Sequence, residues 1–385
     1  MPTKDLNQFV VIVDSRGIVG HKDEDTFRRH ENYGKKLKHL SPSAHFLIIT
    51  ASSKVEKAKI TNYATQKFIK SNKRFSLKYM ISTFLIIKKL STTQVVLVAG
   101  DPWESGVTAK LLQISIKRFL GFRLTIQVQL HADITDEEWK KRNRINRTRA
   151  KSAGFVLRSV DQIRSVSMKL KYDIANAYDL KEEKLIVCPV ALNIPVNSNK
   201  TFCLGRPKAI GFAGRFHDDR GLVEFLAYIE KISLVDSNFE VVLAGDGPKA
   251  PEFLDALNAY IPKNKVNFLG HLNSDEMIEF WSKIGVYIST AKSESYGRSI
   301  REAAFFGIPV LGLPSNGFSE LMSVNVPWIQ VLSLDAPAKE LESQLCRLFK
   351  FVTDDSLQIQ YIRELESNAE YLANSWLKIM PGAQR

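Results

Sequence analysis

The sequence has few cysteines, no long apolar run and no internal repeat. Its 385 residues include three cysteines, Cys188, Cys203 and Cys346, which are too few and too scattered to build a disulfide framework or a cysteine-based metal site. A reducing compartment is therefore expected. No apolar run reaches the ~20 residues that a membrane-spanning helix needs, because the best candidate, 79–100, is interrupted by lysines and by a polar stretch.

The start of the chain does not predict a secretion signal. Met1 leads within a few residues into an apolar run that is typical of a strand, with no separate apolar segment and cleavage site before it. Together with the scarcity of cysteine, this predicts a cytoplasmic protein. The length is enough for roughly two to three domains.

Short apolar runs alternate with longer polar or amphipathic stretches along the chain. This order indicates repeated β-α-β units, and hence an α/β protein with two doubly wound sheets. The join between them is expected within 192–207, where Asn, Pro, Ser and Gly cluster. In the first half, the apolar runs taken as strands are Phe9–Val13, Phe46–Ile49, Val95–Val98, Leu124–Val128, Phe155–Leu157 and Leu185–Val187.

Charge is distributed unevenly between the two halves. Residues 1–200 carry 36 Lys and Arg against 18 Asp and Glu, whereas residues 201–385 carry 18 against 23. The segment Tyr63–Met80 mixes basic, apolar and aromatic residues, a pattern typical of a stretch that lies on an anionic membrane; a solvated basic surface is the alternative. Nucleic acid would be attracted by the same charge, but no recognition motif is present and nucleic acid is not predicted as a partner.

The most informative feature is a pair of carboxylates, Glu294 and Glu302, that lie eight positions apart. They follow the apolar run Val286–Ser289 and flank Gly297, a layout that predicts a strand, a loop and a helix beginning near Arg298. The first amides of such a helix, with the positive end of its dipole behind them, suit a phosphate group. Because a carboxylate on each side can bind hydroxyl groups, the segment predicts a site for a nucleotide sugar.

A second motif for phosphate lies upstream. The apolar run 209–213 leads into Gly214 and Arg215, and Arg220 precedes a helix expected over Gly221–Ile232. Ligands of open α/β sheets bind at the carboxyl ends of strands, and two guanidinium groups there match phosphate oxygens. The intervening Gly-Asp-Gly-Pro segment, 245–248, lacks the third glycine of a dinucleotide fingerprint, so a nicotinamide cofactor is not predicted.

These two motifs closely resemble those of the family 4 retaining glycosyltransferases, which have the GT-B fold. The resemblance implies that Glu294 contacts the donor sugar, that Glu302 binds the ribose, and that backbone amides over 296–299 meet the sugar and the diphosphate. Arg220 replaces the lysine that the family usually carries. The donor-binding residues implied in this way are Gly214, Arg215, Arg220, Glu294, Ser295, Tyr296, Gly297, Arg298, Ser299 and Glu302.

The N-terminal half resembles the same family more loosely. Asp101 and Glu104 belong to a segment similar to the family's Asp-Pro-Phe-Glu, and His131 matches its histidine that contacts the transferred sugar. Asp133 follows in a His-x-Asp segment, and Gly17 lies in a partial match to a glycine-rich loop. The resemblance thus implies an acceptor side of Gly17, Asp101, Glu104 and Asp133, and a catalytic set of His131, Arg215, Arg220 and Glu294.

No metal or other cofactor is predicted. Asp23-Glu24-Asp25 has the D-x-D form that metal-dependent glycosyltransferases use, but it does not follow a buried strand. We interpret it as a charged loop or helix start. The arginines and the helix terminus would then offset the charge of the diphosphate without a cation.

The resemblance implies a GT-B enzyme with two Rossmann-like domains. Residues 1–195 would bind the acceptor and residues 196–365 the nucleotide sugar, while a C-terminal helix at about 366–385 could pack back on the first domain. The expected reaction is sugar transfer, with retention, to a glycan or lipid-linked acceptor in surface polysaccharide or glycolipid synthesis, in the cytoplasm or on the inner face of the plasma membrane. The alternatives are an epimerase or phosphorylase on the same fold, and a non-catalytic binding protein.

Overall fold

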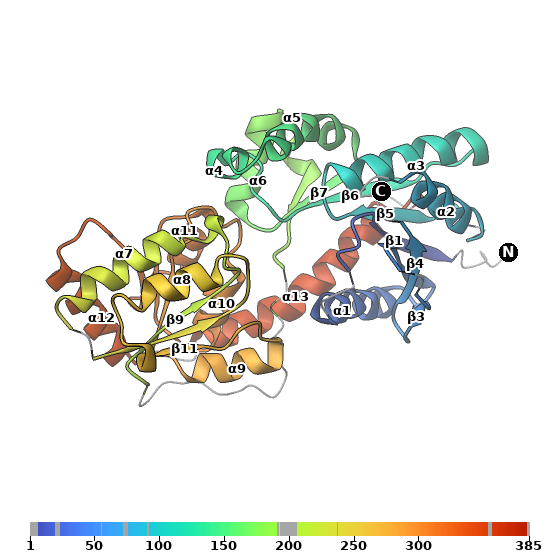
Figure 1. Cartoon of the computed structure of the whole chain (residues 1–385). Coiled ribbons are helices and arrows are strands. Elements are labelled where there is room, and N and C mark those ends of the chain that lie inside the picture. Colours follow the sequence, from blue (N-terminus) through green and yellow to red (C-terminus); the bar gives the residue numbers. More distant parts are fainter. Residues whose placement is uncertain are drawn as a thin grey trace. The chain divides into compact units, whose positions relative to one another are not determined.

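The computed structural model describes residues 7–19, 24–54, 56–71, 76–90, 92–190, 192, 206–236, 238–352 and 356–382. The chain forms two compact units, Met1–Ala191 with Glu366–Arg385, and Leu192–Leu365 (Figure 1). The sequence placed the first boundary after residue 195. Most of the predicted linker, 193–205, lies outside the described residues.

A sheet of eight strands forms the centre of the first unit as described, in the order β3-β4-β2-β1-β5-β6-β7-β8. Its strands pair in parallel, apart from the short antiparallel pair of β3 and β4. Runs of valine, isoleucine and leucine in the central strands are buried on both faces, as parallel sheets require. The strands are β1 Gln8–Asp14, β2 Ala44–Ser52, β3 Lys59–Ile60, β4 Thr65–Lys70, β5 Val95–Ala99, β6 Thr125–Leu130, β7 Gln162–Ser165 and β8 Leu185–Val187.

Helices cover both faces of this sheet (Figure 1). α1 lies on one face with the end of α13, and α2, α3 and α5 lie side by side on the other, where α3 contacts both α2 and α5. Right-handed crossovers produce this arrangement, because strands added in opposite directions from β1 place their helices on opposite faces. The helices are α1 Glu24–Leu40, α2 Leu77–Lys88, α3 Glu104–Leu120, α4 Glu137–Lys141, α5 Arg144–Ser159, α6 Met168–Tyr178 and the 3-10 turn η1 Glu182–Lys184.

The C-terminal helix α13, Ser356–Lys378, ends in the core of the first unit. The Trp376 side chain is fully buried, and its indole N–H donates a hydrogen bond to Gln127 Oε1 at 2.7 Å. Ala369, Leu372 and Ala373 are buried in the same cluster. Truncating a buried tryptophan costs about 3–5 kcal/mol, so the end of this helix is an integral part of the first unit.

A second parallel sheet forms the centre of the other unit, in the order β11-β10-β9-β12-β13-β14 over the described residues. The switch between β9 and β12 is the point where the strand order changes direction, which in open α/β sheets opens a crevice at the carboxyl edge. The strands are β9 Ala209–Ala213, β10 Glu240–Ala244, β11 Val266–Phe268, β12 Val286–Ser289, β13 Val310–Gly312 and β14 Ile329–Val331.

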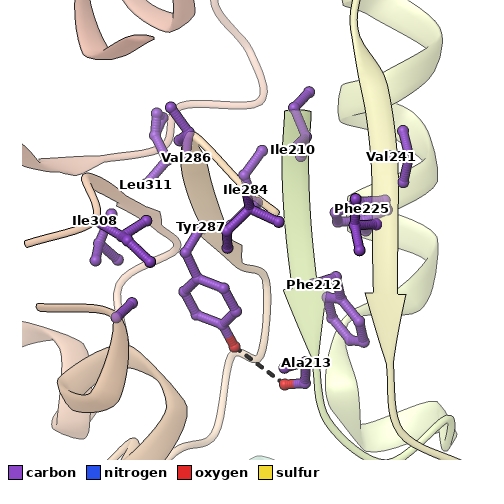
Figure 2. Packing of buried hydrophobic residues seen from close by; sticks show 14 of the residues in the cluster. Ile210, Phe212, Ala213, Phe225, Val241, Ile284, Val286, Tyr287, Ile308 and Leu311 are labelled. Atoms are coloured by element: carbon purple, nitrogen blue, oxygen red, sulfur yellow. Dashed lines mark hydrogen bonds between the residues drawn. The ribbon is translucent and has the colours of Figure 1, made fainter. Parts of the chain in front are cut away.

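The core of the second unit fills the space between this sheet and its helices. Phe212, Phe225 and Tyr287 are buried beside aliphatic side chains of β9, β10 and β12 (Figure 2). The helices are α7 Leu222–Ser233, α8 Ala250–Leu257, α9 Ser274–Ser282, α10 Arg298–Phe305, α11 Asn316–Met322 and α12 Ala338–Lys350, with 3-10 turns η2 Asp218–Arg220 and η3 Lys263–Lys265.

Two predictions about the first unit were wrong. Phe155–Leu157 is not a strand but part of α5, with Phe155 exposed and its two successors buried on one helix face. The segment Tyr63–Met80 does not form one amphipathic surface stretch: its first part is the strand β4, paired with β2, and α2 begins only at Leu77. Residues 72–75 of that segment lie outside the described residues. Among the described helices, none combines the length and apolarity needed to cross a bilayer.

Candidate functional site

The two motifs of the second unit meet at the carboxyl edge of its sheet. β9 ends at Ala213 and leads directly into Gly214. Its neighbour β12 ends at Ser289 and leads into the loop that carries Glu294. Because parallel strands present their carboxyl ends at one edge, segments that are distant in the sequence come together where such sheets bind ligands.

The hydroxyl group of Tyr287, on β12, ties this edge together. It lies 3.0 Å from the carbonyl oxygen of Ala213, the contact drawn in Figure 2, and 2.8 Å from Oγ of Ser299. Burial raises the pKa of this phenol, the bond to Ser299 opposes the shift, and the charges of Glu294 and Glu302 add to it. The phenol therefore stays protonated, and it links the end of β9 to the first turn of α10.

Two glycines allow backbone segments to approach closely at this edge. Gly221 has a φ of 70°, and a Cβ there would lie 1.9 Å from the carbonyl oxygen of Thr290. Gly245 has a φ of 128°, and its Cβ would lie 1.9 Å from the carbonyl oxygen of Gly214. No L side chain fits either place. At Gly214 itself a Cβ would meet nothing closer than 3.9 Å, so the space beside this α-carbon is open.

Arg220 and Glu294, predicted to bind phosphate and sugar respectively, contact each other. Arg220 Nη1 donates to Glu294 Oε2 at 2.6 Å, with the two side chains 25% and 23% exposed. The pair fixes both groups at the sheet edge, but Glu294 also competes with any phosphate for this cation. The guanidinium of Arg215 is more accessible: it is 61% exposed and lies 3.4 Å from Asp219 Oδ2.

Helix α10 begins at Arg298, where the sequence predicted a helix start. Gly297 precedes it in the left-handed conformation, with a φ of 71°. The first amides of α10 thus point toward the loop with the positive end of the helix dipole behind them. Arg298 Nη2 lies 3.4 Å from Glu302 Oε1, with the side chains 41% and 12% exposed. Glu302 is therefore largely buried near the amino-terminal end of the helix.

Arg301 supports this loop, and the sequence analysis did not identify it. The residue is only 5% exposed. Its guanidinium lies 4.0 Å from the centre of the Tyr296 ring and donates hydrogen bonds to the Gly317 carbonyl at 3.2 Å and to Glu320 at 3.3 Å. The Gly317 N–H donates in turn to the Glu294 carbonyl at 2.6 Å. Arg301 and the start of α11 therefore support the loop between β12 and α10, which carries Glu294 and Tyr296.

Gly17, in the first unit, forms a tight turn after β1. Its φ is 67°. The carboxylate of Asp14 accepts hydrogen bonds from the N–H groups of Ile18 at 2.9 Å and Val19 at 2.8 Å. Burial raises the pKa of Asp14, and these hydrogen bonds oppose the shift. The predicted glycine-containing loop is thus held by a buried carboxyl group of the preceding strand.

Asp101 and Glu104 lie beside the start of α3, and neighbours engage both. The Asp101 carboxylate accepts hydrogen bonds from the N–H groups of Trp103 at 2.9 Å and Ser105 at 3.1 Å, so it caps the helix. Glu104 is bonded to Arg149. Over the described ranges, Glu104 Oε2 and Trp103 Nε1 are buried without a hydrogen-bond partner. Glu104 therefore keeps one buried acceptor oxygen without a partner, whereas Asp101 has a local structural role.

His131 follows β6 directly and is exposed to solvent. Its Nε2 lies 3.1 Å from Gln129 Oε1. The surrounding protein lowers the pKa of the imidazole, and the positive charges of Arg164 and Arg29 lower it further. Because the side chain is exposed, water weakens the effect of the surrounding protein on this pKa, but each of these causes lowers it. The imidazole is therefore neutral at pH 7 and can exchange hydrogen bonds with a sugar hydroxyl without carrying charge.

Asp133 shapes the loop after β6. Its Oδ1 accepts hydrogen bonds from the Thr135 N–H at 2.9 Å, the Thr135 hydroxyl at 2.6 Å and the Asp136 N–H at 3.2 Å. The residue is only 4% exposed. These contacts give the predicted acceptor-side carboxylate a structural role in the turn before α4.

The described part of the D-x-D segment is a helix start, as the sequence indicated. Glu24 and Asp25 begin α1, while Asp23 lies outside the described residues. Elsewhere in the described chain, Asp236, Glu342 and Cys346 place ligand atoms within 4.8 Å of one another. None of these three belongs to the predicted donor site.

Comparison with known proteins finds a family similarity in the second unit. Residues 194–344 match the family of glycosyl transferases group 1. The matched stretch lies within the second unit, which is therefore similar to the glycosyl transferases group 1. The matched stretch contains every residue predicted to bind the donor and none of those predicted on the acceptor side or at His131.

One similar sequence is the Schizosaccharomyces pombe phosphatidylinositol N-acetylglucosaminyltransferase gpi3 subunit. The two chains are 23% identical over 174 residues, which is 44% of this chain and 37% of the relative. The chain thus spans little more than a third of that relative's length.

Two solved structures resemble the whole chain. The Anabaena HepE structure in complex with UDP and glucose has a TM-score of 0.64 and 15% identity, covering 96% of this chain and 95% of HepE. The lipopolysaccharide outer core galactosyltransferase WaaB has a TM-score of 0.64 and 14% identity, covering 96% and 99%. At these identities the likeness concerns the fold, and it confirms the predicted GT-B architecture of two Rossmann-like units.

Proposed function

We propose that the protein is a retaining glycosyltransferase of family 4, which moves a sugar from a nucleotide sugar to a glycan or lipid-linked acceptor. The observation that carries the proposal is the convergence of Arg215, Arg220, Glu294 and the start of α10 at one sheet edge. Cationic and amide donors there suit a diphosphate, and carboxylates beside them suit the hydroxyl groups of sugar and ribose.

In the proposed mechanism, the diphosphate binds at the start of α10, and Arg220 exchanges part of its contact with Glu294 for a phosphate oxygen. Arg215, which is exposed, closes on the same group. As the bond between the anomeric carbon and the phosphate oxygen breaks, these donors stabilise the charge that develops on the leaving diphosphate. Glu294 would bind the sugar hydroxyls and Glu302 the ribose.

The acceptor hydroxyl is proposed to attack from the face that the diphosphate leaves, which retains the anomeric configuration. The acceptor proton then passes to the leaving phosphate oxygen, so that no protein carboxylate has to form a covalent intermediate. His131, in the first unit, would contact the transferred sugar as a neutral hydrogen-bonding group. The proposal assigns the acceptor to the first unit.

A metal-free reaction is part of the proposal. Arg215, Arg220 and the helix terminus supply positive charge where other glycosyltransferases use a divalent cation. A cytoplasmic protein that attaches reversibly to the inner face of the plasma membrane, in surface polysaccharide or glycolipid synthesis, is also proposed. The name of the gpi3 relative contains the lipid phosphatidylinositol, and the first half of this chain is basic. Both observations support a lipid-linked acceptor.

A turnover assay with a panel of nucleotide sugars tests the proposal. UDP-sugars come first because HepE was crystallised with UDP. We expect release of nucleoside diphosphate that depends on an added glycan or lipid acceptor, that persists in EDTA, and that gives a product with the anomeric configuration of the donor by NMR. Isomerisation of the donor without acceptor would identify an epimerase, dependence on inorganic phosphate a phosphorylase, and binding without turnover a non-catalytic protein.

A further inference from the structure

The layer formed by α2, α3 and α5 has an unusual charge. The three helices together contain ten Lys and Arg residues and a single acidic residue, Glu104, and Glu104 is bonded to Arg149 within the layer. The exposed basic residues of this surface, here called the basic helix layer, are Lys78, Lys88, Lys117, Arg118, Arg144, Arg147, Lys151 and Arg158.

Large apolar side chains are exposed among these cations. Phe119 is 74% exposed and Phe155 is 73% exposed, although burying such a ring would release about 1.5–3 kcal/mol. On α2, every fourth residue from Leu77 is apolar and exposed, so these side chains form a stripe on the outer face. The exposed apolar residues of the basic helix layer are Leu77, Ile81, Leu85, Ile114, Phe119, Ile145 and Phe155.

The apolar residues are parts of one continuous surface. α3 contacts α2 on one side and α5 on the other, on the same face of the sheet (Figure 1). The Phe84 ring of α2 meets the Phe119 ring of α3 edge to face, with the centroids 6.4 Å apart. On α5, Phe155 lies one helical turn from both Lys151 and Arg158. Phe155 is therefore flanked by cations, and Phe119 directly follows Lys117 and Arg118 in the sequence of α3.

We propose that the basic helix layer docks on an anionic lipid bilayer. A bilayer surface offers a plane of negative charge to the lysines and arginines and an apolar interior to the rings and aliphatic side chains. The inference deepens the proposed function by naming the surface that would hold the enzyme at the membrane. Of Tyr63–Met80, which the sequence suggested for this role, it keeps only the end that begins α2, and it adds the rest of α2 with α3 and α5.

The surface suits a bilayer better than it suits a nucleic acid. Nucleic acid binding without a motif relies on rows of aromatic rings on which successive bases stack, whereas Phe119 and Phe155 lie on separate helices. The scattered apolar residues match shallow insertion between headgroups, which needs no fixed pattern. Long lysine and arginine side chains can extend to phosphate groups while their stems cover apolar surface.

Cosedimentation of the full chain with vesicles tests the proposal. We expect binding to mixed phosphatidylglycerol and phosphatidylcholine vesicles at low salt, weaker binding at high salt, and little binding to phosphatidylcholine alone. Each basic residue near an anionic surface contributes about 1 kcal/mol. The double variant Lys117→Gln with Arg118→Gln should therefore lower the partition coefficient by about 25-fold, and Phe119→Ser should lower it several-fold.

Matched variants on the second unit provide the control. Lys339→Gln with Arg347→Gln removes two exposed cations from α12, and Val223→Ser removes an apolar side chain that is 75% exposed; both should leave vesicle binding unchanged. All these side chains are exposed, so the free energy of unfolding of each variant should stay within about 0.5 kcal/mol of that of the parent chain.

Three outcomes would overturn the proposal. One is a chain that stays in the supernatant with anionic vesicles at low salt. Another is an equal loss of binding in the control variants on α12 and α7. The third is a duplex or single-stranded oligonucleotide that displaces the vesicles and loses its own binding in the Lys117 and Arg118 variant, which would identify nucleic acid as the partner. Because vesicle binding is measured without nucleotide sugar, its failure is separate from a failure of the transfer assay.

Discussion

Replacing Arg301 by methionine perturbs the loop between β12 and α10 without changing a predicted ligand-binding residue. The change keeps a long side chain but removes two charge-assisted hydrogen bonds, to the Gly317 carbonyl and to Glu320, and the contact with the Tyr296 ring. Bonds to charged groups contribute about 1.5–3 kcal/mol each. Glu320 is 27% exposed, which weakens its share, so the expected cost is about 2–3 kcal/mol.

This cost predicts a fall of about 4–12 °C in the unfolding temperature of the second unit, measured by circular dichroism, since 1 kcal/mol shifts a domain of this size by about 2–4 °C. Nucleotide diphosphate should also bind more weakly, because the loop behind Tyr296 loses its support. Arg298→Met is the matched control for stability on the same helix: its side chain is 41% exposed and its contact with Glu302 is long, at 3.4 Å, so it should cost about 0–1 kcal/mol. Equal shifts in the two variants would refute the supporting role of Arg301.

Two further changes test the close backbone contact at Gly221 and the lowered pKa of His30. Gly221→Ala should destabilise the second unit more than Gly270→Ala, because both glycines have positive φ but only the Cβ at 221 would meet a neighbour, Thr290 O at 1.9 Å; equal unfolding temperatures for the two variants would contradict this. Burial lowers the pKa of His30 to about 4 in the folded chain, so the unfolded chain binds the proton first and stability should fall as pH drops below about 6.5. His30→Gln should make that fall shallower in denaturant titrations at pH 7 and pH 5, and an unchanged slope would show that His30 contributes nothing to it.

The donor side could be predicted from the sequence because its chemistry is local. Gly214 directly follows β9 and Gly297 directly precedes α10, and the order of residue types there depends only on the turn. The helix start at Arg298 follows in the same way. By contrast, the bond between Arg220 and Glu294 joins residues from two strand ends, and only the sheet topology brings these together.

The errors and omissions have equally local causes. The apolar run Phe155–Leu157 is too short to distinguish a strand from one turn of a buried helix face, and the flanking basic residues belong to the exposed side of α5. The sequence gives one weak indication of the role of Arg301: the residue falls on a face of a short helix whose other residues are apolar. Its partners Gly317 and Glu320 lie on the next helix, so the sequence does not reveal that the charge is buried.

Calorimetric titration of the glutamate variants with UDP and GDP tests the division of roles at the donor site most directly. Glu302 is largely buried beside the start of α10 and is assigned to the ribose, so Glu302→Ala should weaken nucleotide binding, by roughly tenfold for a lost hydrogen-bonded carboxylate worth about 1.4 kcal/mol. Glu294 is assigned to the sugar and occupies Arg220 at 2.6 Å in this structure. Glu294→Ala should therefore leave nucleotide affinity unchanged or raise it, because it releases Arg220 for the phosphate. Equal losses of affinity in the two variants would contradict the account.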